Sequence, residues 1–157
     1  MRLILVRHAK AENREKWIGS GEDDLKRPLT KKGVKQAKQI AKYIGKKYPN
    51  VDAIISSLAL RACDTAKYIA KKQSHSTFFL NPNINPEEGL QGFLGHKEEI
   101  EDDWQTLVVV GHEPSISEFV RFICAKGTLN LYVGKGCVVE LEREGENDWL
   151  LVGLHNF

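Results

Sequence analysis

The chain has few cysteines. Only three occur among its 157 residues, at Cys63, Cys124 and Cys137, and no two of them form a C-x-x-C pair. A disulfide between any two would leave one thiol unpaired. Small secreted proteins instead usually have an even number of closely spaced cysteines. We therefore expect buried free thiols that serve packing alone, in a protein of the reducing cytoplasm.

The sequence also lacks long apolar runs and a strong excess of one charge. No run approaches the ~20 apolar residues of a membrane span. The only apolar run near the N-terminus, residues 3–6, is too short for a signal peptide. A formal net charge of +2 argues against nucleic acid or an anionic membrane as a partner. The composition leaves the oligomeric state open.

The rest of the composition describes an ordinary globular protein. Hydrophobic residues make up 41% of the chain and charged residues 28%, and both proportions are usual. A chain of 157 residues is long enough to bury a sizeable core as one unit. We predict a single domain over residues 1–157.

Short β-rich runs alternate with amphipathic segments along the chain. Strands are predicted over residues 3–6, 51–55, 78–80 and 106–110, with a hairpin over 137–142 and 149–154. Helices are predicted from the N-cap Thr30 onward, over 61–70, over 87–104 and from Pro114 at a first helical position. This alternation favours an α/β fold: a three-layer α/β/α arrangement with a mostly parallel central sheet and an antiparallel C-terminal edge hairpin.

Polar side chains follow three of the predicted strands. Arg7-His8 ends the first strand, Ser56-Ser57 ends the second just before a helix that carries Arg61, and His112 ends strand 106–110. The carboxyl ends of parallel strands lie at one edge of a sheet, where α/β proteins bind ligands. Two of these ends also lead into helix N-termini, which favour anions. Two arginines and two histidines around one cavity indicate a phosphate site, because unpaired positive groups need an anion to neutralise them.

Each of these residues also has a plainer interpretation. Arg7-His8 could be a strand running out into a polar loop, Arg61 a surface arginine, and His112 a turn or capping residue. His8 and His112 could instead ligate a metal ion, but the neighbouring arginines would repel a cation, and no third ligand with suitable spacing occurs. Their joint placement at strand ends favours the phosphate site, with no metal and no other cofactor.

Residues 10–29 are polar and contain Gly19, Gly21 and Pro28. They are predicted to form a long loop, and loops of this length in compact proteins are usually functional. Because the segment leaves Arg7-His8 directly, we expect it to form one wall of the pocket.

Four segments resemble the histidine phosphatase superfamily, in the form found in SixA-type phosphohistidine phosphatases. They occur in the family's order between residues 2 and about 123. The four are Leu5-Val6-Arg7-His8-Ala9-Lys10-Ala11, Arg27-Pro28-Leu29-Thr30-x-x-Gly33, Ser56-Ser57-x-x-x-Arg61-Ala62-x-x-Thr65-Ala66 and Val110-Gly111-His112-Glu113-Pro114. The resemblance implies a phosphoglycerate mutase-like fold and a phosphatase activity.

The resemblance also implies a role for each matching residue. His8 would be the nucleophile that becomes a phosphohistidine, while Arg7, Arg61 and His112 would bind the phosphoryl oxygens and stabilise the transition state. The chemistry is consistent with these roles. An imidazole attacks through one nitrogen when it is neutral and the proton on its other nitrogen is held, commonly by a backbone carbonyl. Positive neighbours would lower its pKa and keep it neutral.

The sequence departs from the family in two places. Leu58 stands where the family usually has proline, and Ala11 and Arg14 replace the Ser and Asn of the phosphoglycerate mutase branch, which counts against a mutase. The proton donor for the leaving group has two candidate positions. It could be Glu113, or a residue of the acidic segment, Glu87 or Glu88. A phosphohistidine substrate has a good leaving group and could need no donor.

These observations lead to one expected function and two alternatives. We expect a metal-independent phosphatase that works through a phosphohistidine on His8 and acts on a phosphohistidine of a partner protein, such as a phosphorelay domain. The first alternative is a phosphatase of small phosphate esters. The second is a non-catalytic module that binds phosphorylated ligands in the same pocket.

Overall fold

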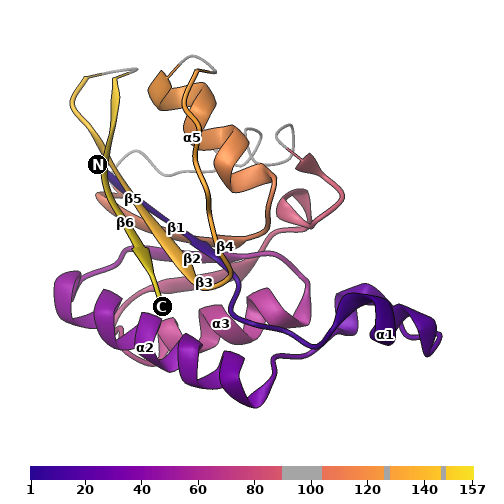
Figure 1. The fold of residues 1–157 in the computed structure, drawn as a ribbon. Coiled ribbons are helices and arrows are strands. Elements are labelled where there is room, and N and C mark those ends of the chain that lie inside the picture. The colour runs from indigo at the N-terminus through magenta and orange to yellow at the C-terminus, as the bar shows by residue number, and fades with distance from the viewer. Residues whose placement is uncertain (90–103, 126–127, 146–147) are drawn as a thin grey trace.

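The structure, a computed structural model, describes residues 1–89, 104–125, 128–145 and 148–157. These residues form a six-stranded sheet with helices on both faces (Figure 1), in the order β3-β2-β4-β1-β5-β6. The strands are β1 (Arg2–Arg7), β2 (Ala53–Ser56), β3 (Thr77–Leu80), β4 (Thr106–Gly111), β5 (Cys137–Arg143) and β6 (Trp149–Asn156). The first four pair in parallel, and β5 and β6 add an antiparallel edge. The predicted three-layer α/β fold is confirmed.

Helices cover the two faces of the sheet. In Figure 1, α2 (Lys31–Lys47) and α3 (Leu60–Ala70) lie on one side, and α5 (Ser115–Ala125) lies on the other. Thr30 caps α2 as predicted, because its Oγ1 accepts a hydrogen bond from the backbone N–H of Gly33 at 3.0 Å. Within the described ranges, no helix is long and apolar enough to cross a membrane.

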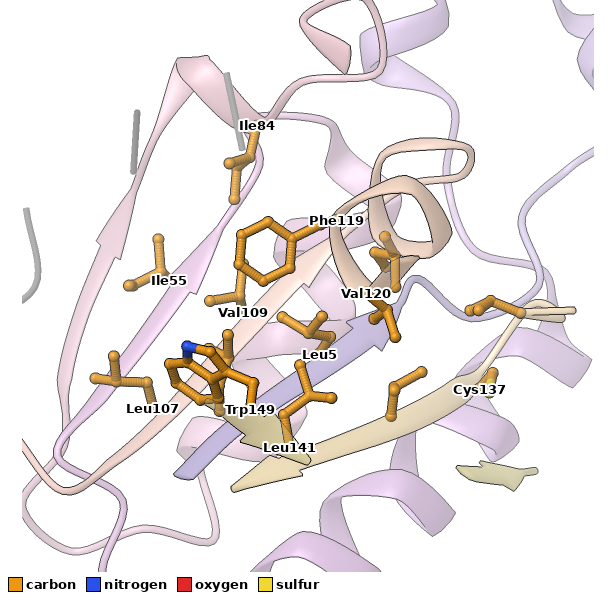
Figure 2. Packing of buried hydrophobic residues seen from close by; sticks show 14 of the residues in the cluster. Leu5, Ile55, Ile84, Leu107, Val109, Phe119, Val120, Cys137, Leu141 and Trp149 are labelled. Carbon is orange, nitrogen blue, oxygen red and sulfur yellow. The ribbon is translucent and has the colours of Figure 1, made fainter. Parts of the chain in front are cut away.

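The central strands are buried on both faces, so successive residues enter two different cores. In β1, Leu3 and Leu5 belong to the core beneath α5, whereas Ile4 and Val6 belong to the core beneath α2 and α3. Figure 2 shows the first core, in which Leu5 and Val109 of the sheet lie near Phe119 and Val120 of α5. This double burial explains why the strands read as continuous apolar runs.

Three sequence predictions need correction. Residues 10–29 are not a plain loop: they contain α1 (Arg14–Gly19) and the 3-10 turn η1 (Asp24–Lys26), and a bridge between Ala11 and Leu29 closes the base of the segment. Helix α1 was missed because none of its residues is buried, so it carries no apolar stripe. A second 3-10 turn, η2 (Pro82–Ile84), follows β3.

The two other corrections are smaller. Helix α5 begins at Ser115 rather than at Pro114, whose carbonyl accepts the hydrogen bond from Glu118 N at 3.0 Å. The three cysteines are free, but Cys124 is only half-buried. Of the acidic helix predicted over 87–104, residues 90–103 lie outside the described residues.

Gly33 joins α2 to the backbone that leaves the end of β1. A Cβ added at this position would overlap the carbonyl oxygen of Lys10, which also accepts hydrogen bonds from the backbone N–H and the hydroxyl of Thr30 at 3.0 and 3.1 Å. The close approach of these two backbones therefore requires glycine.

We predict that Gly33→Ala destabilises the protein by about 1–3 kcal/mol or more, because backbone must move to relieve the overlap. Urea unfolding would measure the loss. Gly19→Ala is the matched control, since a Cβ there meets nothing within 4 Å. Equal stability of the two variants would show that the Gly33 contact is not restrictive.

Candidate active site

The carboxyl ends of the parallel strands open into a pocket of about 580 Å³. All four residues singled out from the sequence line it, namely Arg7, His8, Arg61 and His112. Two backbone hydrogen bonds continue the strand pairing into the site: His8 N donates to Gly111 O, and Ser57 N donates to Val110 O, each at 3.1 Å. The parallel register therefore brings these side chains together.

His8 lies at the end of β1 with its ring held by backbone. Its Nδ1 is 2.8 Å from the carbonyl oxygen of Ala9. Because a carbonyl only accepts, Nδ1 carries the proton and Nε2 of the neutral ring is unprotonated. Ala9 is itself held, since its N–H donates to Thr65 Oγ1 at 3.1 Å. The predicted arrangement of a histidine anchored to a backbone carbonyl is present.

Burial lowers the pKa of His8 to about 3. Its side chain is almost fully enclosed, and loss of hydration disfavours the charged ring. The guanidinium groups of Arg61, Arg7 and Arg27 lower the pKa further, while the hydrogen bond to Ala9 acts in the opposite direction. His8 is therefore neutral at physiological pH, chiefly through burial and only secondarily through the positive neighbours that the sequence suggested.

Arg61 reaches both His8 and a carboxylate. Its Nε is 3.3 Å from His8 Nε2, while Nη1 donates to the Asp24 carbonyl at 2.8 Å and Nη2 to Asp24 Oδ2 at 3.0 Å. The expectation that the positive groups are unpaired is thus wrong for Arg61. The Asp24 carboxylate in η1 pairs with the Arg61 guanidinium in α3 and holds it next to His8.

Asp24 was missed because it lies in a polar stretch that has no periodicity. Its Oδ1 also accepts from Arg27 Nε at 2.9 Å and lies 3.6 Å from Arg14 Nε. Partial burial by itself would raise the pKa of Asp24, but the hydrogen bond from Arg27 and the nearby positive charges hold it below the ordinary value. The carboxylate is therefore ionised and links three arginines.

Arg27 is the second residue that sequence reasoning left without a role, although it opens the matched segment at residues 27–33. It is nearly fully buried, and its Nη1 donates to the Glu12 carbonyl at 2.8 Å. Arg27, Arg14 and Asp24 all line the pocket. The segment 10–29 thus forms a wall of the pocket, as predicted.

Arg7 and His112 each present a buried polar atom that has no hydrogen-bond partner among the described residues. Arg7 Nη1 donates to the Val133 carbonyl at 2.7 Å, and His112 Nε2 lies 2.8 Å from Ser57 Oγ. By contrast, Arg7 Nε and His112 Nδ1 are buried and have no hydrogen bond to any described residue. Buried polar atoms are rarely left unsatisfied in proteins, so this pair points to a ligand that contacts both.

Comparison with known proteins supports a family assignment. The model of the histidine phosphatase superfamily (branch 1) matches residues 3–91. An uncharacterized protein of Picosynechococcus sp. is 31% identical over 130 residues, which cover 78% of this chain and 73% of that protein. The chain belongs to the histidine phosphatase superfamily. As a member of this superfamily, it is a phosphatase.

Solved structures share the fold over almost their whole length. The structure described as the phosphohistidine phosphatase SixA of Agrobacterium tumefaciens has a TM-score of 0.82 at 21% identity, covering 99% of this chain and 97% of that one. The protein histidine phosphatase SixA complexed with tungstate has a TM-score of 0.81 at 16% identity, covering 98% and 96%. The phosphoglycerate mutase-like fold implied by the sequence motifs is confirmed.

The three candidate proton donors differ in position. Glu113 lines the pocket, and its Oε1 accepts from Ser117 N at 3.0 Å, which caps α5. Glu87 also lines the pocket and is exposed, whereas Glu88 is exposed and is not among the lining residues. In the described part of the chain, no group of three His, Cys, Asp or Glu residues is arranged to hold a metal ion.

We predict that stability falls as the pH drops below about 6.5, the ordinary pKa of histidine. The pKa of His8 is about 3 and that of His112 about 2 in the folded protein. The unfolded chain therefore binds protons in this window that the folded protein does not. Each histidine contributes a slope of at most about 1.4 kcal/mol per pH unit.

Urea unfolding between pH 7 and pH 4 measures this slope. It should be smaller in the double variant His8→Gln/His112→Gln, and unchanged in His75→Gln, which removes an exposed histidine. Identical slopes in wild type and double variant would contradict the buried neutral state of the two rings.

Proposed function

We propose that this protein removes the phosphoryl group from a phosphohistidine of a partner protein, through a covalent phosphohistidine on His8. One observation carries the proposal. A neutral histidine with a proton-free Nε2 lies in the same pocket as two buried polar atoms, Arg7 Nε and His112 Nδ1, that lack partners among the described residues. A tetrahedral oxyanion bonded to His8 would bring acceptor oxygens into the pocket that Arg7 and His112 line.

The cations of the pocket suit the charge that develops during phosphoryl transfer. Arg7 and Arg61 would donate to the equatorial oxygens together with His112, and the guanidinium fork is well matched to such oxygens. Fixed donors aimed at developing charge are the largest source of catalysis in many enzymes. One SixA structure that shares this fold is complexed with tungstate, an oxyanion of the same tetrahedral kind.

The reaction takes two displacements at phosphorus. In the first, the His8 Nε2 lone pair forms the P–N bond while the bond from phosphorus to the substrate nitrogen breaks, and that nitrogen keeps the electron pair. In the second, a water oxygen attacks phosphorus, the P–N bond to His8 breaks, and the ring returns to its neutral form. The water proton leaves with the phosphate or passes to solvent. The first step needs the neutral His8 that burial provides, and the second step restores it.

Glu113, Glu87 and Glu88 are the candidates for protonating the leaving group. Of the three glutamates, Glu113 is the best placed, because it lines the pocket and is anchored by Ser117 N. Glu88 does not line the pocket, which makes it the weakest candidate. A phosphohistidine substrate lowers the demand for a donor, since the leaving imidazole nitrogen is a better leaving group than an alkoxide.

The mouth of the pocket favours a macromolecular substrate. Arg14, Glu87 and Lys135 line it and are exposed, so the pocket reaches the protein surface. A phosphorylated side chain that protrudes from a partner could enter while the partner's backbone stays outside. The fold shared with SixA proteins over nearly their full length supports the same substrate class.

We expect His8→Ala to lower kcat/KM for a phosphorylated substrate by about a thousandfold or more, as loss of a nucleophile does. After a substrate pulse, the wild-type protein should carry acid-labile, base-stable phosphate, and His8→Ala should carry none. His75→Ala, which removes an exposed histidine, serves as control and should keep wild-type activity. Full turnover by His8→Ala would exclude it as the nucleophile.

The substrate class is tested by comparing kcat/KM on a phosphohistidine-containing phosphorelay domain with kcat/KM on sugar phosphates and a model aryl phosphate. We expect the phosphohistidine protein to be preferred by about tenfold or more, equivalent to about 1.4 kcal/mol of transition-state binding. A preference for the small esters would assign the enzyme to them. Phosphate-dependent binding without any turnover would indicate a binding module.

A further inference from the structure

A buried chain of hydrogen bonds connects His112 to residues outside the pocket lining. Asn85, which follows η2, has its Oδ1 2.9 Å from the backbone N–H of Leu58 and 2.9 Å from Ser57 Oγ. The N–H of Leu58 can only donate, so the atom facing it is the amide oxygen rather than the amide nitrogen. An amide oxygen only accepts, and therefore the Ser57 hydroxyl donates its proton to Asn85.

The direction of that bond determines the protonation of His112. With its hydrogen directed to Asn85, Ser57 Oγ has only lone pairs for its other neighbours. It accepts from Ala59 N at 3.1 Å and faces His112 Nε2 at 2.8 Å. His112 Nε2 must therefore be the donor and carry the proton. In the neutral ring the other nitrogen, Nδ1, is then proton-free, and it has no partner among the described residues.

A proton-free Nδ1 is the wrong partner for a phosphoryl oxygen. The lone pair of Nδ1 would face a lone pair of the phosphoryl oxygen. The other groups proposed to bind the anion are all hydrogen-bond donors. Ring rotation or a change of tautomer would break the bond to Ser57, which is completely buried. The ring can become a donor toward the anion in place only by gaining a proton at Nδ1.

We propose that Ser57 and Asn85 are positioning residues that hold His112 as its Nε2–H tautomer, and that binding of a phosphoryl-like anion transfers one proton from solvent to His112 Nδ1. The inference rests on the proposed function, because it concerns the same phosphoryl pocket. No covalent bond to carbon or phosphorus changes in this step. The proton joins the Nδ1 lone pair when the anion binds and returns to solvent when the anion leaves.

The charges around His112 explain why protonation needs the anion. From β1 it faces His8 and Arg7, from α3 Arg61, and from the segment after η1 Arg27, while the carboxylates of Asp24 and Glu113 line the same pocket. Burial first, then the interaction with His8 and the positive charges of Arg61, Arg27 and Arg7, lower the pKa of His112 to about 2 without a ligand. A bound dianion offsets the repulsion and stabilises the imidazolium. Anion affinity should then weaken as pH rises, because the complex holds more protons than the free protein.

Sulfate is the appropriate probe, because it stays fully ionised near neutral pH and exchanges no proton of its own. Calorimetric titration of the whole protein with sulfate, repeated in buffers of different ionisation enthalpy, gives the number of protons taken up. We expect about one proton per sulfate for wild type. His8→Gln should retain this uptake, and His112→Gln should lose it while still binding sulfate through the arginines.

Several outcomes would overturn the proposal. Sulfate binding by the wild-type protein without proton uptake would refute it. Proton uptake that disappears in His8→Gln and persists in His112→Gln would also refute it. The experiment does not depend on turnover. An inactive protein that takes up a proton on His112 would refute the proposed function but support this inference. An active phosphatase that binds sulfate without proton uptake would support the proposed function but refute this inference.

The positioning role of Ser57 and Asn85 is tested separately, through the tautomer of His112. Two-bond ¹H–¹⁵N spectra of the wild-type protein should show His112 as the Nε2–H tautomer, and an Nδ1–H pattern would contradict the argument before any variant is made. Ser57→Ala should lose that single pattern and lower kcat/KM by about 10- to 100-fold, as removal of supporting contacts does elsewhere. Ser57→Thr, which keeps the hydroxyl, should restore both.

Ser56→Ala is the matched control. Ser56 is adjacent and equally buried, but its hydroxyl donates to the Ser57 carbonyl at 2.9 Å. It should leave the tautomer of His112 unchanged. If Ser57→Ala fails to fold, Asn85→Asp provides the test, because a carboxylate still accepts from Ser57 and Leu58 and should preserve the Nε2–H tautomer. A change of tautomer in Ser56→Ala equal to that in Ser57→Ala would refute the specific role of Ser57.

Discussion

Repulsion among the arginines that surround His8 is the constraint on which this candidate site depends. Arg7, Arg27 and Arg61 converge around His8, and enclosing charges in a protein costs free energy unless partners compensate. Asp24 supplies one negative charge and links Arg61 to Arg27. The remaining excess of positive charge has two effects. It helps to keep His8 neutral, and it leaves the pocket short of an anion.

The sheet supplies the rigidity that such a charged arrangement needs. His8 and His112 follow adjacent parallel strands, and their backbones are tied together by the bond from His8 N to Gly111 O. On the other side of β1, Gly136 N, just before β5, bonds to the carbonyls of Arg7 and His8 at 3.2 and 3.1 Å. His8 therefore lies on backbone held from both sides, and such support keeps the groups of a site in place.

The sequence predicted most of the sheet and the central residues of the site because both rest on simple rules. Strands such as β1 and β4 are buried on two faces, so their composition alone reveals them. Arg7, His8, Arg61 and His112 come together because parallel strands end at one edge. Helix α1 could not be predicted, because an exposed helix has no apolar stripe. Asp24 lies in a turn, and the local sequence does not indicate which arginine it will pair with.

What the sequence determined by itself, then, is the succession of the strands and the larger helices along the chain, the family and the identity of the converging basic residues. Burial patterns and motifs are local properties of the chain. The tertiary structure decided how these residues are charged and oriented. The low pKa of His8 comes mainly from enclosure by segments distant in sequence, and the pairing of Arg61 with Asp24 spans 37 positions. The tautomer of His112 depends on Asn85, which reaches it through Ser57. Enclosure and hydrogen-bond direction arise only when separate segments meet in space.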